Sequence, residues 1–242
     1  MSVSLAVEKL SAGYGPTQVL DDIDFSVPAG GSLALLGRNG VGKTTLLSTL
    51  MGFTTLRGGR ILLDGKPIER LAPFQRNRRG LGFVPQEREI FASLSVDENL
   101  AIACRSGGWT LERVYDVFPG LAARRRNAGN KLSGGEQQML AIGRALVGAP
   151  KVLLLDEPME GLAPVVVDAL YDALEAIRAT SGLTIVIVEQ KAELALGIAR
   201  EAIVLDRGRI VWAGESGTLR ADAALQAKLL AVGADGHEIE AA

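Results

Sequence analysis

The chain has 242 residues with 26 basic and 28 acidic side chains, and its formal charge of -2 gives no overall attraction to nucleic acid or to anionic lipid. The lone cysteine, Cys104, and the lone histidine, His237, exclude an internal disulfide, a metal cluster of cysteines or histidines, and a Ser-His-Asp triad. The apolar runs are far too short to cross a bilayer and the N-terminus has no signal-peptide pattern, so we expect a cytoplasmic protein.

The first third of the sequence predicts an antiparallel sheet that leads into a parallel one. Residues 23–27 alternate between apolar and polar, which is typical of an antiparallel strand with one solvated face. Residues 33–36 are apolar throughout, as expected of a strand that is covered on both faces. Helical spacing over residues 43–52 ends on a glycine that suits a left-handed cap, and Asp64-Gly65 predicts a hairpin turn.

The middle of the chain predicts an inserted helical subdomain. Ser95 and Glu98 form a capping box, and the helical pattern that they open continues to about residue 148. Strands and helices alternate before and after it, with strands at 81–86, 151–155, 184–188 and 202–205 and helices at about 164–179 and 191–198. We therefore predict one α/β domain over residues 1–233, with the helical subdomain at about 95–148 and a polar tail at 234–242.

Two short basic clusters occupy residues 76–79 and 123–126, and neither contains an aromatic residue. Runs this short are most often solvated surface, so we predict that their side chains are exposed. A basic patch of the kind that binds DNA or RNA is not expected, and we predict no nucleic-acid partner.

A phosphate-binding loop follows the apolar strand directly. The segment "GRNGVGKTT" fits the pattern G-x-x-x-x-G-K-[ST] from Gly37 to Thr44, and a helix follows it. Such a loop folds its backbone N-H groups into a nest around phosphate oxygens, and the helix N-terminus adds partial positive charge. We expect Lys43 to reach the β- and γ-phosphates, the Thr44 hydroxyl to bind Mg²⁺, and Thr45 to contact the α-phosphate.

An acidic pair, Asp156 and Glu157, comes at the end of the buried strand "KVLLL". Open α/β sheets place their ligands at the carboxyl ends of their strands, so this pair lies where the phosphate loop also converges. We expect Asp156 to hold Mg²⁺, largely through water, and Glu157 to orient and deprotonate the attacking water.

A second candidate phosphate contact starts the segment "KLSGGEQQMLAIGRAL". Ser133 and Glu136 form a capping box, which by itself requires no function beyond starting a helix. Gly134 and Gly135 are poor residues for a first helical turn unless something must approach the backbone closely. An anion at this helix N-terminus is one such reason.

The combination of "GRNGVGKTT", "LSGGEQQ" and "VLLLDEP" resembles the ABC-type ATPases, and the resemblance extends from Tyr14 to about Trp212. It implies a P-loop NTPase of ABC type, with a mostly parallel core sheet, an N-terminal antiparallel β subdomain and an inserted helical subdomain. It also implies a head-to-tail dimer around two ATP molecules, in which Ser133, Gly134 and Gly135 contact the γ-phosphate held on the opposite subunit.

The same resemblance implies roles for single residues. Tyr14 matches the aromatic that stacks on adenine, and Gln86 matches the glutamine that senses Mg²⁺ and links the site to the helical subdomain. In the segment 159–164, which crosses the dimer interface, Met159 and Glu160 depart from the usual small or polar residues.

The candidate residues fall into three groups. The nucleotide-binding candidates are Tyr14, Gly37, Asn39, Gly40, Gly42, Lys43, Thr44, Thr45, Gln86, Ser133, Gly134 and Gly135. The magnesium candidates are Thr44, Gln86 and Asp156, and the catalytic candidates are Lys43, Glu157 and Gln190.

Gln190 stands where the family usually has a histidine, just after the strand "TIVIV". A neutral amide can donate a hydrogen bond to phosphate but cannot carry a proton near pH 7. We expect the strand to end on the polar pair Glu189 and Gln190 because its tip meets the nucleotide. The segment "VEQ" resembles one branch of the family, the ATPases of importers for branched-chain amino acids and for urea and similar amides.

We therefore predict an ATP- and Mg²⁺-dependent ATPase subunit of an importer, peripheral on the cytoplasmic face of the cell membrane. The resemblance implies two integral-membrane permease subunits, a solute-binding protein, and either a second related ATPase or a second copy of this chain. Alternatives are a urea or amide importer ATPase of the same branch, a soluble ABC ATPase without a transport role, and a regulatory nucleotide-binding module. Glu157 argues against the last of these, because ATP binding alone does not require it.

Overall fold

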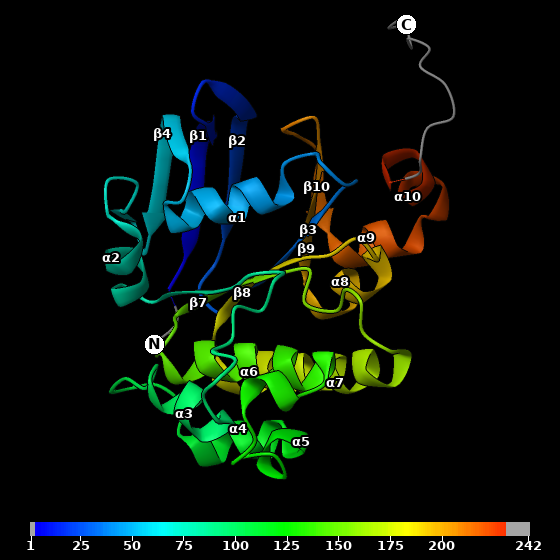
Figure 1. Cartoon of the computed structure of the whole chain (residues 1–242). Coiled ribbons are helices and arrows are strands. Elements are labelled where there is room, and N and C mark those ends of the chain that lie inside the picture. The colour runs from blue at the N-terminus through cyan, green and yellow to red at the C-terminus, as the bar shows by residue number, and fades with distance from the viewer. Residues whose placement is uncertain (1–2, 231–242) are drawn as a thin grey trace, which may run out of the picture.

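The computed structural model describes residues 3–230, which form two β-sheets with helices between and beneath them (Figure 1). The N-terminal sheet is antiparallel and has the strand order β2-β1-β4-β5. Its strands are β1 (Leu5–Tyr14), β2 (Thr17–Val27), β4 (Thr55–Leu63) and β5 (Lys66–Pro67). The predicted turn between β4 and β5 is confirmed, since Asp64 and Gly65 have φ angles of 52° and 70°.

The second sheet has the order β10-β9-β3-β8-β7-β6. All its strand pairs are parallel except β10 with β9, so the predicted combination of an antiparallel sheet and a mostly parallel core sheet is confirmed. The strands are β3 (Ser32–Leu36), β6 (Leu81–Val84), β7 (Val152–Asp156), β8 (Thr184–Val188), β9 (Glu201–Asp206) and β10 (Arg209–Glu215).

Helices cover both faces of the parallel sheet, which explains why β3 is apolar on both sides. Leu33 and Leu35 point into the core shared with the antiparallel sheet and α1 (Lys43–Met51), whereas Ala34 and Leu36 point into the core on the other face. The helices of that second face are α6 (Gly134–Val147), α7 (Pro164–Ser181), α8 (Ala192–Ile198) and α9 (Ser216–Ala221).

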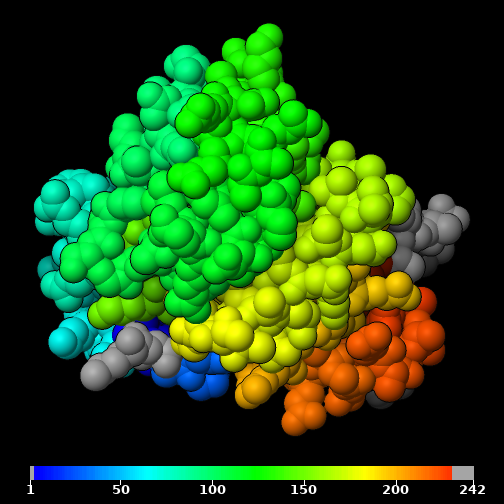
Figure 2. Space-filling model, turned by 90° about the horizontal axis from the view of Figure 1, so that it is seen from below, coloured from blue at the N-terminus to red at the C-terminus, as the bar shows by residue number. Residues whose placement is uncertain are grey.

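The helices predicted between residues 95 and 148 gather at one end of the molecule, where they cover much of the face seen from below together with α7 (Figure 2). They are α3 (Val96–Ala101), α4 (Leu111–Val117), α5 (Pro119–Ala122), a single 3-10 turn (Gly129–Lys131) and α6. Both capping boxes are present: the amides of Glu98 and Glu136 donate to the hydroxyls of Ser95 and Ser133 at 3.2 and 3.3 Å. No helix among residues 3–230 is long and apolar enough to span a membrane.

The C-terminal part differs from the prediction. Beyond β10 the chain continues into α9 and α10 (Ala223–Leu230), which the sequence analysis did not predict. Alanine and glycine occupy most of the exposed positions of these short helices, so the alternation of apolar and polar residues is weak. The polar tail 234–242 and His237 lie outside the described residues.

A further helix, α2 (Pro73–Arg78), was also missed, and one of the two basic clusters is not simply a surface run. The arginines of residues 123–126 are exposed as predicted, but Arg76 is only 4% exposed. Its guanidinium donates to the carbonyls of Leu71, Glu69, Thr49 and Leu50 at 2.7–2.9 Å. The last two carbonyls belong to the C-terminal turn of α1, so Arg76 satisfies the open end of the helix that starts at the phosphate loop.

Arg76→Ala is therefore expected to lower the free energy of unfolding by roughly 3 kcal/mol or more, because it leaves four buried carbonyls without their donor. Arg78→Ala, in the same helix, is the matched control: Arg78 is exposed and lies over the Phe74 ring, so its loss should cost at most about 1 kcal/mol. Urea unfolding of both variants measures the difference, and equal destabilisation would contradict this role of Arg76.

Candidate functional site

The phosphate loop joins β3 to α1 in the predicted way. Gly37 has φ 145°, and a Cβ at this position would lie 2.4 Å from the Leu205 carbonyl oxygen, so no larger residue fits without a shift of the backbone. Gly42, with φ 112°, is the N-cap of α1 and provides no side-chain acceptor for the first amides of the helix. The N-terminus of α1 therefore has free N-H groups and partial positive charge for an anion.

Lys43 is buried at the base of this loop, with 4% of its surface exposed. Its ammonium donates to the carbonyls of Gly37 and Arg38 at 2.9 and 3.0 Å and lies 3.5 Å from Oε1 of Glu157. The bonds to the loop carbonyls hold the cation at the cleft, where phosphate oxygens can compete for it.

Thr44 and Asp156 meet across the site: the Thr44 hydroxyl donates to Oδ1 of Asp156 at 3.3 Å. Burial, opposed by the Thr44 hydrogen bond and reinforced by the nearby Glu157, raises the pKa of Asp156 to about 6. A hydroxyl and a carboxylate this close fit Mg²⁺, which prefers a few protein oxygens and completes its shell with water and phosphate. Within residues 3–230, no cluster of three or more acidic, histidine or cysteine side chains forms a metal cage.

Glu157 and Gln190, two of the three catalytic candidates, are in direct contact. The Gln190 amide donates to Oε2 of Glu157 at 2.7 Å. Glu157 is 7% exposed, and its backbone has φ 46°, a sparsely populated region for a residue with a side chain. Its backbone N-H donates to the Val188 carbonyl at 3.0 Å, which holds this conformation in place at the ends of β7 and β8.

Glu189 corrects one expectation. The strand was predicted to end on the polar pair Glu189 and Gln190 because its tip meets the nucleotide, but only Gln190 lines the cleft. Glu189 is 3% exposed and accepts a hydrogen bond from the Met159 amide at 2.9 Å. Neighbouring strand residues point to opposite sides, so a polar pair at a strand end cannot direct both side chains to one ligand. Glu189 instead fixes the segment that follows Glu157.

Glu189→Gln is expected to make the protein more stable above pH 7. Burial, reinforced by Glu157 and Glu160 and opposed by the Met159 hydrogen bond, raises the pKa of Glu189 from 4.5 to about 7. The folded state then holds this proton more tightly than the unfolded chain, so wild-type stability falls as the pH rises from 4.5 to about 7. A neutral amide avoids that loss, which amounts to at most about 3 kcal/mol, and can still accept from Met159.

Denaturant unfolding at pH 5 and pH 8, with chelator and without nucleotide, measures this effect. The advantage of Glu189→Gln should grow between the two pH values, and an advantage that does not change with pH would contradict the assigned titration. Glu193→Gln, at an exposed position of α8, is the control and should show no such trend.

A cleft of about 290 Å³ brings most of the candidates together. It is lined by Asn39, Gly40, Gly42, Lys43, Thr44, Thr45, Gln86, Glu157, Glu160 and Gln190. Within this cleft the Gln86 amide donates to the Glu160 carboxylate. Glu160, noted in the sequence only as a departure from the family, is therefore in contact with a candidate magnesium residue.

Gly37 and Asp156 adjoin this cleft through their hydrogen bonds to Lys43 and Thr44, and the other four candidates lie elsewhere. Tyr14 is 49% exposed at the end of β1, and Ser133, Gly134 and Gly135 form the start of α6, outside the residues that line the cleft. Gly135 has a packing reason within the chain, because a Cβ there would lie 2.4 Å from Cγ1 of Val166. The absent side chain of Gly134 instead faces a polar group, the Arg88 guanidinium.

Sequence reasoning missed two arginines near these residues. Arg88 lies against Gly134, and Arg144 of α6 donates to the Glu89 carbonyl at 2.6 Å while its guanidinium lies over the Phe91 ring. Arg88 and Glu89 both have positive φ, 62° and 47°, so the chain after β6 turns sharply to reach α6. Neither residue stands in a recognisable motif, and no sequence signal marks a contact between segments more than 40 residues apart.

The fold and the cleft together define the class of this protein. A phosphate loop between a parallel strand and a helix, with a threonine in the first turn of that helix and two acids at the carboxyl end of β7, is the arrangement of a P-loop nucleoside triphosphatase.

Comparison with known proteins narrows the class to one family. A family model described as "ABC transporter" matches residues 20–160, more than half of the chain, so the chain belongs to the ABC transporter family and is an ATPase of that family. The high-affinity branched-chain amino acid transport ATP-binding protein BraG of Pseudomonas aeruginosa is 41% identical over 216 residues, which are 86% of this chain and 91% of BraG. The probable branched-chain amino acid transport ATP-binding protein LivF of Archaeoglobus fulgidus is 37% identical over 89% of this chain and 93% of its own length.

A solved structure supports the same fold. The structure of cbiO1 from Clostridium perfringens, described as part of the ABC transporter complex cbiONQ, has a TM-score of 0.78 and 30% identity and covers 93% of each chain.

Proposed function

We propose that this chain hydrolyses ATP to drive uptake of branched-chain amino acids, or of a related small polar solute, through separate permease subunits. The observation that carries the proposal is the meeting of Lys43, Glu157 and Gln190 in one cleft beside the phosphate loop. The likeness to BraG and LivF supports the solute class. Residues 1–233 form the ATPase domain in this proposal, with the helical subdomain at about 95–148.

In the proposed mechanism, the backbone of the phosphate loop and the N-terminus of α1 bind the phosphates. Lys43 leaves the Gly37 and Arg38 carbonyls for phosphate oxygens. Thr44, Asp156 and Gln86 would hold Mg²⁺, which would neutralise charge on the phosphates. Gln190 orients the Glu157 carboxylate, and Glu157 takes a proton from the attacking water.

The site is completed by a second chain in this proposal. Tyr14, on the outer end of β1, stacks on the adenine of the same chain's ATP, while Ser133, Gly134 and Gly135 reach the ATP of the partner. The position of α6 outside the cleft supports this arrangement, because these residues contribute nothing to the site of their own chain. The partner is a second copy of this chain or a related ATPase.

A groove next to the cleft supports the proposal of permease partners. It has a volume of about 820 Å³ and runs from Thr44, Asp156 and Gln86 to Phe53 and Phe74. Phe53 and Phe74 are 55% and 60% exposed and line the same groove, and apolar side chains gathered on one exposed surface mark interaction sites. A membrane subunit seated here would touch the nucleotide site through Gln86, so we place the chain at the cytoplasmic face of the cell membrane.

Affinity purification from solubilised host membranes tests the proposal. Tagged Glu157→Gln protein with ATP and Mg²⁺ is expected to recover polytopic permeases, together with a solute-binding protein that identifies the solute. The double variant Phe53→Ser, Phe74→Ser should lose the permeases, whereas Val211→Ser, 50% exposed on β10, should keep them. Recovery of ribosomal or DNA-bound proteins without any membrane partner would overturn the transport role and favour a soluble ATPase.

A further inference from the structure

The N-terminus of α6 carries more positive charge than a helix start usually does. Arg88 comes from the turn after β6, and a Cβ built on Gly134 would lie 3.3 Å from one of its terminal nitrogens. The guanidinium therefore lies against the first turn of α6, whose free N-H groups already give partial positive charge. A cation at this end of a helix is unfavourable unless an anion is also present.

Arg88 is held in this place by its own side chain and by its backbone. Its Nε donates to Oε1 of Gln138 at 3.2 Å, and Gln138 is 2% exposed in the second turn of α6. Arg144 donates to the Glu89 carbonyl at 2.6 Å and so fixes the turn that carries Arg88. The guanidinium is thus directed toward Gly134 by contacts that leave its two terminal nitrogens free.

The charge of Arg88 is not balanced within the described part of the chain. None of the ion pairs among residues 3–230 includes it, and its terminal nitrogens donate to no acceptor there. Glu136, the acid of the first turn of α6, already accepts from the Ser133 amide at 2.7 Å and from Arg124 at 3.3 Å. The Nε2 atom of Gln138, next to Arg88, is buried and likewise lacks a partner among these residues.

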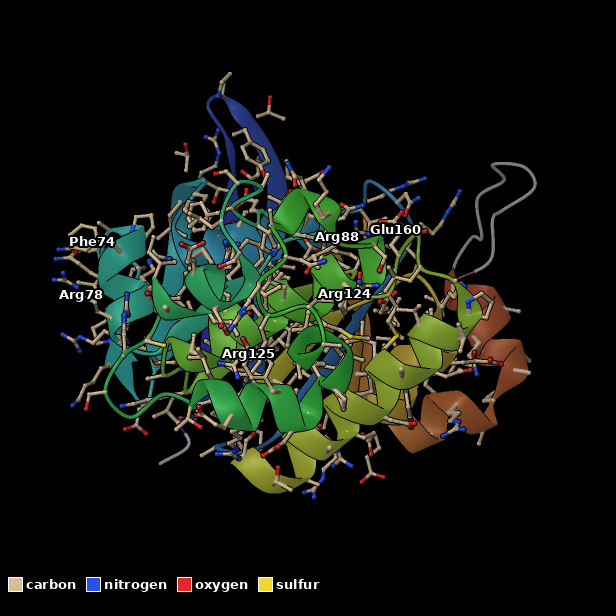
Figure 3. The ribbon with its side chains drawn as sticks, turned by 60° about the horizontal axis from the view of Figure 1, so that its bottom comes forward. Phe74, Arg78, Arg88, Arg124, Arg125 and Glu160 are labelled. Atoms are coloured by element: carbon tan, nitrogen blue, oxygen red, sulfur yellow. The ribbon has the colours of Figure 1, made fainter. Side chains whose placement is uncertain are left out.

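The ligand that fits is a phosphate group brought by another molecule. Several donors and a net positive charge converge at one point, which suits a multiply charged anion with several oxygens. Arg88 does not line the cleft of its own chain, although Gln86 two residues earlier does. Figure 3 shows Arg88 and Arg124 in one region of the view with Glu160, well away from Phe74 and Arg78 on α2.

We propose that Arg88 binds the terminal phosphate of the ATP held by the phosphate loop of a second copy of this chain. This assignment rests on the proposed head-to-tail dimer and adds a cationic side chain to the N-terminus of α6. The guanidinium neutralises phosphate charge where the two chains meet, so dimer closure depends on ATP and on Arg88 of the opposite subunit.

Two mixtures that contain the same substitutions test whether Arg88 acts across the dimer. All chains carry Glu157→Gln so that ATP persists, and one chain in each mixture is tagged. In the first mixture, one chain carries Lys43→Ala and the other Arg88→Ala. In the second, one chain carries both changes and the other carries neither. ATP-dependent capture of the untagged chain by the tagged chain is measured in each.

The first mixture forms one complete site if Arg88 acts on the partner's ATP, because the intact Lys43 and the intact Arg88 then face each other. The second forms none between its two different chains. We expect at least ~10-fold more capture in the first mixture, as loss of a charge-assisted contact implies. Equal capture, or more capture in the second mixture, overturns the proposal.

Ser133→Ala in place of Arg88→Ala separates this inference from the proposed dimer. If the Ser133 mixtures show the expected difference and the Arg88 mixtures do not, the dimer stands and the role of Arg88 is wrong. If neither set shows it, the head-to-tail dimer is wrong as well.

Two further variants distinguish charge from folding. Arg88→Lys keeps the charge and is expected to restore part of the capture, whereas Arg88→Gln keeps a hydrogen-bond donor without charge and is expected to behave like Arg88→Ala. Equal capture with lysine and glutamine would show that Arg88 acts only through the structure of α6, and would overturn the proposal. Arg78→Ala, on the exposed side of α2, is the control for loss of a surface arginine.

Discussion

Glu157→Gln is expected to bind ATP and Mg²⁺ as the wild type does and to hydrolyse ATP at least ~100-fold more slowly. The carboxylate is 7% exposed, is oriented by the Gln190 amide at 2.7 Å and lies 3.5 Å from the Lys43 ammonium. Glutamine has nearly the same shape but cannot accept a proton from water, and loss of a general base typically lowers the rate by a factor of 10² to 10⁴.

Steady-state phosphate release and fluorescent-nucleotide binding measure the two quantities separately. Glu193→Gln, an exposed acid at the start of α8, is the control for removal of one negative charge near the cleft and should turn over like the wild type. Normal turnover of Glu157→Gln would show that another group activates the water. A loss of binding equal to the loss of rate would instead show that Glu157 mainly supports the phosphate loop.

Lys43→Ala is expected to weaken ATP binding at least ~10-fold and to reduce hydrolysis at least ~100-fold. A charge-assisted hydrogen bond to phosphate is lost, which is worth about 1.5–3 kcal/mol in the bound state, and more is lost as charge develops in the reaction. The change also leaves Glu157 buried without the cation that lies 3.5 Å away in the unliganded structure. Removal of one partner of a buried pair is more costly than its net interaction suggests.

Lys43→Arg shows whether charge alone is sufficient. The Lys43 ammonium donates to the carbonyls of Gly37 and Arg38, and Lys43 is only 4% exposed. A larger, planar guanidinium cannot make the same two hydrogen bonds in this buried space. We expect the arginine variant to be nearly as defective as the alanine variant in hydrolysis. Lys66→Ala, in the exposed hairpin of β4 and β5, is the control, and full activity of Lys43→Arg would contradict the requirement for this geometry.

Much of the nucleotide cleft could be predicted from local patterns. The loop from Gly37 to Thr44 is continuous in sequence, and its conformation follows from its glycines and from the strand and helix that flank it. Asp156 was placed beside it by a general property of parallel sheets, in which the carboxyl ends of strands share one edge. The contact between the Thr44 hydroxyl and Asp156 follows from that reasoning.

Other features of the site and the fold depend on contacts between side chains that lie far apart in the sequence. Arg76 belongs to a short basic run, and such runs are usually exposed to solvent. It is buried because the C-terminal turn of α1 packs against it and accepts its hydrogen bonds. Glu189 and Gln190 are adjacent and both polar, yet one is buried against Met159 and the other faces the cleft. Gly135 was expected to allow a close approach to its backbone, and the side chain that approaches it within the chain is Val166 of α7.

The sequence by itself determined the α/β class, the phosphate loop, the acidic pair and the neutral residue at position 190, because each depends on spacing within one strand, turn or helix start. Only the tertiary structure decided the burial of Arg76, the inward turn of Glu189 and the position of Arg88 against Gly134. These contacts join segments that lie far apart in the chain. Their geometry is set by the packing of helices on the sheet, and no local sequence pattern predicts it.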